Sequence, residues 1–323
     1  MKTIIPIFFS VNDNYSPFLA TAIHSIRENA SPEFHYKIHI LTDDISAENR
    51  GKLSRFACPG FDVQFHPLSR LLRGIPSVNA LSQHCFGAFS SLTIYFRLFI
   101  PDLFPQYDKG IYLDADLVVP GDISQLYREP LGGKLIGAVA DYSVRKIGPF
   151  VKYIDEYVGV SPWNYVNSGV LLLNMRRLRE VNFSRCFLSW VERYGLETVA
   201  PDQDYLNALC RDKIHYLDPD WNAMPSECLS ALDAPQIIHF NLASKPWLNE
   251  QVPYGEVFWQ YAAGSGYEEE IRARRQSFLQ NPAAMKQYKS AIGRLIRMAC
   301  RLTRSVHSFR AVLENRQALR ICS

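Results

Sequence analysis

No apolar run in this sequence approaches the ~18–20 residues that a membrane-spanning helix needs, and no internal repeat or low-complexity segment is found. The apolar run Ile4–Val11 leads directly into Asn12-Asp13-Asn14 without a small-residue cleavage site, which favours a buried first strand over a signal peptide. The 323 residues are 47% apolar and 21% charged, values that exclude disordered, collagenous and simple coiled-coil proteins.

The sequence has only seven cysteines, which are widely spaced along the chain. It contains no C-x-x-C motif. An odd number without such a motif argues against a disulfide framework and against a cysteine zinc site, and it indicates a reducing cytoplasm. Each cysteine is therefore expected to be a small apolar residue of the core.

Charge is distributed unevenly along the chain. Residues 286–323 contain nine Lys or Arg against Glu314 alone, a net charge of +8, which leaves −5 on residues 1–285 because the whole chain carries +3. A mildly acidic body argues against a nucleic-acid partner.

Apolar strands alternate with helical stretches through the first half of the sequence, which predicts an α/β fold with a Rossmann-like, mostly parallel twisted sheet and helices on both faces. The expected strands are Thr3–Val11, Tyr36–Leu41, Phe61–Phe65, Gly110–Val119 (interrupted by acids), Leu135–Ala140, Gly169–Asn174, Lys213–Leu217 and Gln236–Phe240. The expected helices are Pro17–Glu28, Ser46–Phe56 with Ser46 as its cap, Ser91–Ile100 ended by Pro101, Phe183–Tyr194 and Gln203–Arg211. Asn281-Pro282 is the expected boundary between the body of the chain, 1–282, and a basic helical tail, 283–323.

Two aspartates, Asp114 and Asp116, interrupt the strand Gly110–Val119. Side chains two residues apart on extended backbone point to the same side, so the two carboxylates lie close together. Like charges raise each other's pKa unless a cation neutralises them, and hard oxygen ligands suit a divalent metal ion. Asp-x-Asp taken alone is equally compatible with a solvated pair that closes a strand.

A second polar group, His239-Phe-Asn-Leu-Ala-Ser-Lys245-Pro-Trp247, follows the last expected strand. Ligands of open α/β sheets bind beyond the carboxyl ends of the strands, where His239 could reach the same ion as the aspartates. Mixed carboxylate and imidazole ligation suits Mn²⁺ better than Mg²⁺, and Lys245 offers a point charge for a phosphate. The alternatives are a core histidine and a surface lysine, which the pairing with Asp-x-Asp makes less favoured.

In this order the motifs resemble the retaining glycosyltransferases of family 8, which have the GT-A fold and include bacterial lipopolysaccharide galactosyl- and glucosyltransferases and the glycogenins. The resemblance covers residue 1 to about 260. The further motifs that carry it are Asn12-Asp-Asn14-Tyr15, Tyr95-Phe-Arg97, Tyr165-Val-Asn167-Ser-Gly169-Val-Leu-Leu-Leu-Asn174, Pro201-Asp202-Gln203-Asp204-Tyr-Leu-Asn207 and Trp221-Asn222-Ala-Met224-Pro225.

The resemblance implies how the donor nucleotide and its metal are bound. The expected metal ligands of Mn²⁺, with Mg²⁺ as the alternative ion, are Asp114, Asp116 and His239. Tyr15 would stack on uracil, or else pack at a helix start. Asn12 and Asn14 would lie near the nucleoside, Asp114 would also approach the ribose, and Lys245 would contact phosphate.

The resemblance also implies a set of residues around the donor sugar, each of which has a structural alternative. They are Arg97 (or a surface ion pair), Asp141 (or a turn), Asn167 (or a turn before a strand), Asp202 (or a helix cap) and Gln203 (or an ordinary helical residue). Asp141, Asp202 and Gln203 are the candidate catalytic residues.

One position departs from the family pattern. Family members usually have glycine three residues after the histidine, and this chain has Leu242. Glycine would let a backbone N–H approach the phosphate closely, whereas leucine adds a side chain and disfavours positive φ. Position 12 also carries Asn where some relatives have an acid.

The reaction implied by the resemblance moves galactose or glucose from a UDP-sugar to a saccharide through an oxocarbenium-like state. The ion and Lys245 would stabilise the departing UDP. Because the amide of Gln203 is a poor nucleophile, same-face attack is favoured, with a diphosphate oxygen as base for the acceptor hydroxyl. The alternatives are a protein or soluble-glycan acceptor, and a catalytically weak nucleotide-sugar-binding protein.

The basic tail has helical periodicity. On one helix, apolar residues from Ile292 to Phe309 would share a face and Arg294, Arg297, Arg301 and Arg304 would share the opposite one. This pattern predicts that 286–323 lies on an anionic membrane surface, on the cytoplasmic face, where a lipid-linked acceptor such as lipopolysaccharide core would be reached. The alternatives are a helix packed on the body and an oligomer contact.

Overall fold

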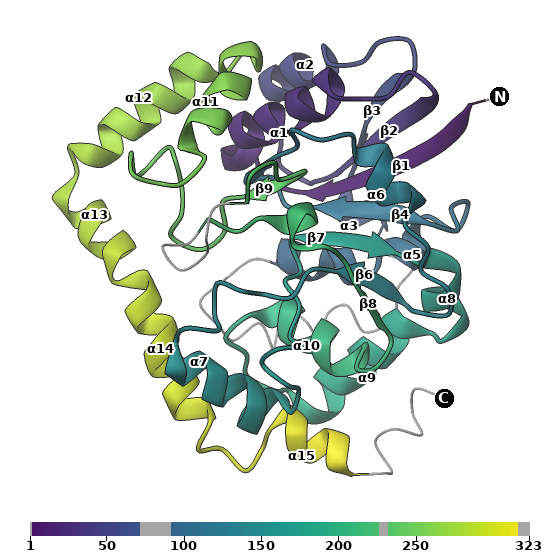
Figure 1. Ribbon diagram of the computed structural model, residues 1–323, viewed down its shortest axis with the longest axis vertical. Coiled ribbons are helices and arrows are strands. Elements are labelled where there is room, and N and C mark those ends of the chain that lie inside the picture. The colour runs from purple at the N-terminus through teal and green to yellow at the C-terminus, as the bar shows by residue number, and fades with distance from the viewer. Residues whose placement is uncertain (1, 72–91, 226–231, 316–323) are drawn as a thin grey trace. The chain divides into compact units, whose positions relative to one another are not determined.

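The computed structural model describes residues 2–71, 92–225 and 232–315 (Figure 1). The chain forms two compact units that interleave along the sequence. Unit 1 consists of Met1–Pro67, Ile111–Glu129 and Asp218–Gly293, and unit 2 consists of Leu68–Gly110, Pro130–Leu217 and Arg294–Ser323. Each unit therefore combines segments that are far apart in the sequence.

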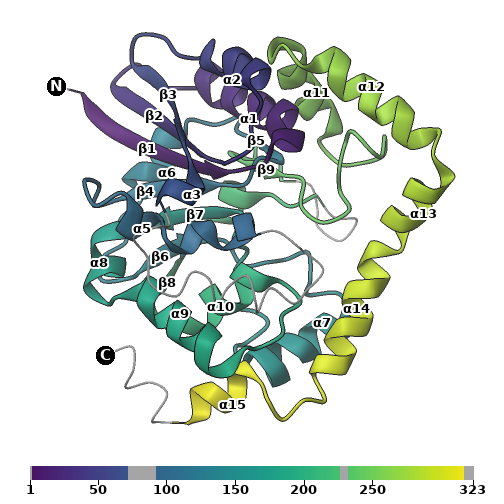
Figure 2. The same ribbon diagram turned by 180° about the vertical axis from the view of Figure 1, so that it is seen from behind.

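Unit 1 contains a parallel sheet in the order β3-β2-β1-β4. Its strands are β1 (Thr3–Ser10), β2 (Phe34–Leu41), β3 (Phe61–His66) and β4 (Gly110–Leu113). Five consecutive residues of β1, from Ile5 to Phe9, are buried, which is typical of a strand covered on both faces. Figure 2 shows β1, β2 and β3 side by side with α1 and α2 next to them.

The helices of unit 1 include α1, which packs against α2, α11 and α12, and α13, which contacts α12. The helices are η1 (Asp13–Tyr15), α1 (Ser16–Glu28), α2 (Ala47–Ser54), α6 (Ile123–Arg128), η5 (Pro219–Asn222), α11 (Gly255–Gly264), α12 (Glu268–Leu279) and α13 (Pro282–Lys289). Ser46 caps α2 as predicted, because its hydroxyl oxygen accepts the Asn49 N–H at 3.2 Å. A separate antiparallel pair joins β5 (Leu117–Val118) to β9 (Ile238–His239).

Unit 2 contains the strand order β7-β6-β8, with β6 antiparallel to β7 and parallel to β8. The strands are β6 (Ile136–Ala138), β7 (Val170–Leu173) and β8 (Ile214–Tyr216). The helices are α3 (Leu68–Leu71), η3 (Leu92–Leu98), α5 (Ile100–Leu103), α7 (Gly148–Tyr153), η4 (Ile154–Val158), α8 (Met175–Glu180), α9 (Phe183–Tyr194), α10 (Pro201–Leu209), α14 (Ala291–Leu302) and α15 (Phe309–Glu314). Mostly parallel strands with flanking helices confirm the predicted α/β class.

The predicted helix Ser91–Ile100 was wrong in two respects. Residues Leu92–Leu98 form a 3₁₀ helix, and its predicted first residue, Ser91, lies outside the described residues. Pro101 does not end a helix but lies in the first turn of α5, where the missing N–H has no helical partner to lose. The predicted interruption of Gly110–Val119 is confirmed, since β4 and β5 are separate strands.

The basic tail does not form one continuous helix. α14 ends at Leu302, and Phe309 begins a separate helix, α15. Leu295, Ala299 and Leu302 on α14 are buried, and the ring of Phe309 packs 4.8 Å from that of Tyr205 in unit 2. The apolar face predicted to meet a membrane is thus covered by protein at these positions.

The cysteine predictions hold only in part. Cys210 is buried and free, as expected. Cys58 and Cys300 are free but exposed, so the expected burial was wrong for them, and Cys186 is buried but disulfide-bonded, so the expected free thiol was wrong there. Within residues 2–71, 92–225 and 232–315, no helix combines the length and apolar character needed to cross a membrane.

Candidate active site

Strand pairing brings Asp116 and His239 together although 123 positions separate them in the sequence. In the β5–β9 pair Leu117 lies opposite His239, and the Phe240 N–H donates to the Asp116 carbonyl at 2.9 Å. Asp114 follows β4, which runs parallel to β1. The carboxyl end of β4 and the short antiparallel pair thus place two carboxylates and an imidazole at one point of unit 1.

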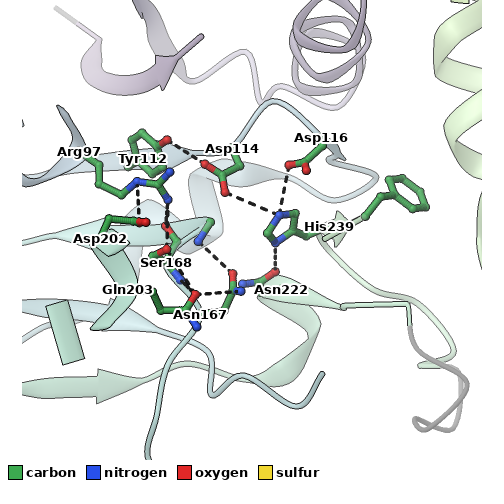
Figure 3. A network of polar contacts seen from close by, with 12 residues as sticks. Arg97, Tyr112, Asp114, Asp116, Asn167, Ser168, Asp202, Gln203, Asn222 and His239 are labelled. Atoms are coloured by element: carbon green, nitrogen blue, oxygen red, sulfur yellow. Dashed lines mark hydrogen bonds and ion pairs between the residues drawn. The ribbon is translucent and has the colours of Figure 1, made fainter. Parts of the chain in front are cut away.

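The three predicted metal ligands lie within reach of a single ion (Figure 3). His239 Nε2 is 3.2 Å from Asp116 Oδ1 and 3.8 Å from Asp114 Oδ2, and one ligand atom from each residue lies within 4.8 Å of the others. The other ring nitrogen, Nδ1, is 3.1 Å from Asn222 Oδ1. With Nδ1–H donating to Asn222, the Nε2 lone pair faces the carboxylates, as a metal-binding imidazole requires.

Lys245 forms an ion pair with the carboxylate of Asp116. Its ammonium donates to Asp116 Oδ2 and to the Phe240 carbonyl oxygen. Burial by itself would raise the pKa of Asp116, but the Lys245 ammonium beside it outweighs burial and holds that pKa well below its usual range. Asp116 is therefore an anion at all ordinary pH values, and the donor set of two carboxylates and an oriented imidazole fits a divalent ion.

Aromatic rings line the loop after β1. Tyr15 is 40% exposed, its ring makes an edge contact with Phe18 at 5.7 Å, and Phe18 stacks on Trp247 at 4.0 Å. Removal of its hydroxyl from solvent raises the pKa of Tyr15 above its ordinary value, and the charges of Asp116 and Asp114 add to the effect. Tyr15 thus presents an open ring face close to the metal-ligand group.

The same loop holds an unpartnered acceptor. Asn12 Oδ1 is buried and has no hydrogen-bond partner in the described structure, whereas Asn14 is exposed and its carbonyl accepts from Arg274. Asp13 fixes the loop, because its Oδ1 accepts from the Ser46 N–H at 2.9 Å and from Asn49 Nδ2 at 2.8 Å. A buried orphan acceptor costs free energy unless a ligand donates to it.

Unit 2 carries the residues predicted around the donor sugar, and three of them form one hydrogen-bonded cluster (Figure 3). Gln203 Nε2 donates to Asp141 Oδ2 at 3.0 Å, and Asn167 Nδ2 donates to the same oxygen at 3.1 Å. Gln203 Oε1 accepts the Ser168 N–H at 3.0 Å. All three side chains are buried, so the Gln203 amide is held in one orientation.

Arg97 and Asp202 support this cluster from one side. Arg97 Nε lies 3.1 Å from Asp202 Oδ2, with both side chains buried, and Arg97 Nη1 donates to the Ser168 carbonyl at 2.8 Å. The α10 N-terminus, with Pro201 in its first turn, carries Asp202 and Gln203. The helix dipole favours an acid in the first turn of a helix. Asp202 is therefore stabilised both by the α10 dipole and by its ion pair with Arg97.

Asp204, one turn into α10, is fully buried and accepts hydrogen bonds from Tyr165 Oη at 2.6 Å and Tyr153 Oη at 2.7 Å. Burial raises the pKa of Asp204 from 3.8 to about 6, an effect that the tyrosine hydrogen bonds only partly offset. The Asp141 N–H in turn donates to the Tyr165 carbonyl at 2.8 Å. Asp204 therefore helps to fix the segment that carries Asp141.

Sequence reasoning assigned no role to Asn222, Ser168 or Asp204. All three lie inside the motifs quoted above, so the motifs themselves contained the signal. Their roles depend on partners from other segments, namely His239 for Asn222 and Gln203 for Ser168.

Leu242 adopts the conformation that its residue type disfavours. Its φ is +47°, in the left-handed region, and its side chain is 40% exposed. A non-glycine residue held there costs about 1–2 kcal/mol. Leucine was expected to disfavour a positive φ at this position. The loop between His239 and Lys245 nevertheless holds Leu242 at a positive φ, so its backbone is strained.

The family model described as Glycosyl transferase family 8 matches residues 6–251, about three quarters of the chain. The chain belongs to glycosyltransferase family 8. Two relatives are a putative glycosyltransferase of Haemophilus influenzae, 25% identical over 68% of this chain, and general stress protein A of Bacillus subtilis, 25% identical over 80% of this chain. This glycosyltransferase spans 93% of the length of the Bacillus protein but only 64% of the Haemophilus relative.

Solved structures agree with the assignment. A galactosyltransferase, LgtC, solved in complex with donor and acceptor sugar analogs, is 26% identical, has a TM-score of 0.64, and is matched over 80% of this chain and 96% of its own. The bifunctional glycosyltransferase WbbM is 24% identical with a TM-score of 0.72 over 85% of this chain and 52% of its own, and it supports the fold alone. The predicted GT-A fold is confirmed. The family implies a nucleotide-sugar donor and a saccharide acceptor, and its enzymes generally use a divalent metal.

Proposed function

We propose that this glycosyltransferase transfers galactose or glucose from a UDP-sugar to a saccharide acceptor with retention at the anomeric carbon, and that it depends on Mn²⁺. The observation that carries the proposal is the convergence of Asp114, Asp116 and His239, with Asn222 fixing the imidazole. Mixed oxygen and nitrogen ligation favours Mn²⁺ over Mg²⁺.

Residues of unit 1 bind the nucleotide in this proposal. The open face of Tyr15 stacks on uracil, and the buried, unpartnered Asn12 Oδ1 accepts a base N–H. The Asn14 side chain lies near the nucleoside, and Asp114 approaches the ribose. A uracil N–H would satisfy the orphan acceptor, which is the chemical reason to favour UDP.

Asp114, Asp116 and His239 would hold the ion, which when bound supplies Lewis-acid stabilisation of the diphosphate leaving group. Lys245 holds Asp116 by its ammonium and offers positive charge to a phosphate at the same point of unit 1. Its ammonium nitrogen lies 5.7 Å from the Trp247 ring centre, within the range of a cation–π contact.

Residues of unit 2 bind the donor sugar. Asp141, Asn167 and Gln203 form a buried polar surface, positioned by the Arg97–Asp202 ion pair. The Gln203 amide is a weak nucleophile whose oxygen already accepts the Ser168 N–H. We therefore favour same-face attack: the acceptor oxygen bonds to C1, the C1–O bond to the diphosphate breaks, and the acceptor proton passes to a diphosphate oxygen of the leaving UDP.

The acceptor is proposed to be a lipopolysaccharide or another cell-surface glycan, reached at the cytoplasmic face of the membrane. The exposed side chains of Arg294 and Arg297 on α14, and of Arg304 just after it, support an electrostatic contact with anionic lipid, worth ~1 kcal/mol per cation near the surface. Since Leu295, Ala299 and Leu302 are buried, the contact would use charge rather than inserted apolar side chains. Protein and soluble-glycan acceptors are the alternatives.

A donor panel tests the proposal. UDP release is measured for UDP-galactose, UDP-glucose and their N-acetylated and acidic analogues, with Mn²⁺, with Mg²⁺ and with chelator. The proposal expects Mn²⁺-dependent release from UDP-galactose or UDP-glucose, and retained anomeric configuration in the product by NMR. Tight UDP binding without turnover of any donor would instead favour a nucleotide-sugar-binding protein.

A further inference from the structure

Trp163 is a tryptophan left largely in solvent. Its side chain is 69% exposed, although it lies in unit 2 between the buried residues of η4 and β7. Single exposed apolar residues are common and prove nothing alone. The surroundings of Trp163, however, hold it in a fixed position.

Arg145 lies between two rings. Its guanidinium carbon is 4.2 Å from the ring centre of Tyr142 and 5.1 Å from that of Trp163, and Nη2 donates to the Trp163 carbonyl oxygen. Arg145 Nε is buried and has no hydrogen-bond partner in the described structure. The stack therefore presents an aromatic ring that a guanidinium group and a backbone hydrogen bond hold in place.

The loop that carries Trp163 is braced on both sides. The Asn164 N–H donates to the Ser161 carbonyl at 2.9 Å, which closes a turn around Trp163, and Tyr216 Oη donates to the Asn164 carbonyl at 3.1 Å. An exposed aromatic ring that is already ordered loses little conformational entropy when a ligand binds. This arrangement is more typical of a ligand-binding surface than of an exposed aromatic side chain without a function.

The stack adjoins the proposed donor-sugar cluster. Tyr142 directly follows Asp141, and Trp163 is four residues from Asn167, so their Cα atoms are at most ~14 Å apart. The two segments are joined by the antiparallel bridge Ala140–Val166. A ligand that reacts at this cluster would extend over the stack within one or two sugar units.

We propose that Tyr142, Arg145 and Trp163 form a platform that binds the acceptor saccharide, holding the sugar unit next to the one that accepts the transferred hexose. This inference rests on the proposed function, because it assigns a place to that reaction's acceptor. Apolar faces of pyranose rings stack on aromatic side chains, and the exposed ring of Trp163 offers such a surface. Tyr15 serves the base in unit 1, which leaves the platform to the acceptor.

The test compares Trp163→Ala, Trp163→Phe and a control, Trp259→Ala. Trp259 is likewise stacked by an arginine, with the Arg272 guanidinium carbon 4.4 Å from its ring centre, but it lies on α11 of unit 1. Folding of each variant is checked by thermal unfolding. Acceptors are cellobiose, lactose and maltose, each paired with its terminal monosaccharide.

For Trp163→Ala we expect the KM for the best disaccharide to rise about tenfold, and the preference for the disaccharide over its monosaccharide to fall by the same factor. Trp163→Phe should recover most of this loss, the donor KM should stay within twofold, and Trp259→Ala should match the wild type. An unchanged disaccharide preference in Trp163→Ala would overturn the platform, as would a wild type without any such preference. A rise in the donor KM instead would assign the stack to the nucleotide. If the wild type transfers nothing, the proposed function itself fails.

Discussion

Substitution of Leu242 by glycine separates the cost of a strained backbone from the cost of a side chain near the proposed phosphate site. The φ of Leu242 is +47°, and relief of that conformation is worth about 1–2 kcal/mol. Glycine loses about 0.5–1 kcal/mol through greater freedom of the unfolded chain. Loss of the partly buried leucine side chain, 40% exposed, costs a further ~1–2 kcal/mol.

These terms nearly cancel, so we expect the free energy of unfolding of Leu242→Gly to lie within about 1 kcal/mol of the wild type. The effect on the donor is expected to be larger than the effect on stability. Without the side chain the loop N–H groups can approach a diphosphate, and the Kd for UDP in the presence of Mn²⁺ should fall several-fold, by about threefold to tenfold for one improved hydrogen bond.

Leu242→Ala is the matched control, because it removes most of the side chain but keeps the Cβ that disfavours positive φ. It should be less stable than Leu242→Gly by about 1 kcal/mol and gain less UDP affinity. Urea unfolding measures the first quantity and calorimetric titration the second. If Leu242→Gly binds UDP more weakly than the wild type, the leucine contributes to the site and the reasoning fails.

Three further substitutions test separate parts of the structure. Asn222→Leu should leave the fold intact but weaken Mn²⁺ affinity 10–100-fold, because the His239 ring loses the partner that orients it; calorimetric titration with Mn²⁺ measures this. Asp204→Asn should remove a pH dependence of the free energy of unfolding. The pKa of Asp204 is about 6 in the folded protein and 3.8 in the unfolded chain, so Asp204 contributes about 3 kcal/mol of stability below about pH 4, which is lost as the pH rises through 6. Urea unfolding between pH 4 and 7 measures this difference. The double variant Arg297→Gln and Arg304→Gln should weaken sedimentation with phosphatidylglycerol vesicles about tenfold or more and leave UDP release unchanged.

Each of these outcomes has a clear opposite. Full Mn²⁺ affinity in Asn222→Leu would mean that His239 is not a ligand oriented by this contact. If the free energies of unfolding of the wild type and Asp204→Asn change in parallel between pH 4 and 7, Asp204 does not titrate in that range in the folded protein. Equal vesicle binding by the arginine variant would assign α14 to packing on unit 2 alone, where Arg301 already pairs with Glu197 at 2.6 Å.

Most strands were predictable because local apolar runs mark them, whereas their order in the sheet was not predicted. β1 and α9 were predicted to within a residue or two, since each has a clear apolar pattern and a clear end. The 3₁₀ segment Leu92–Leu98 was not, because its apolar residues fit an α-helix equally well and the choice depends on tertiary packing.

The convergence of the three metal ligands was predicted from their places at strand ends and from the family resemblance, but the strand pairing that produces it was not. The convergence depends on the β5–β9 pairing, which joins two-residue strands too short to recognise from sequence. The tail shows the same limit: its amphipathic pattern is real, yet the pattern cannot say whether protein or lipid covers Leu295, Ala299 and Leu302.

The central claim is that Asp114, Asp116 and His239 hold a divalent ion on which nucleotide binding depends. Calorimetric titration of UDP into the wild type and Asp116→Asn, each with Mn²⁺ and with chelator, tests it most directly. We expect UDP to bind the wild type only with Mn²⁺, and to bind Asp116→Asn at least 100-fold more weakly while its thermal unfolding stays near that of the wild type. Equal, Mn²⁺-dependent UDP affinity in both proteins would contradict the account.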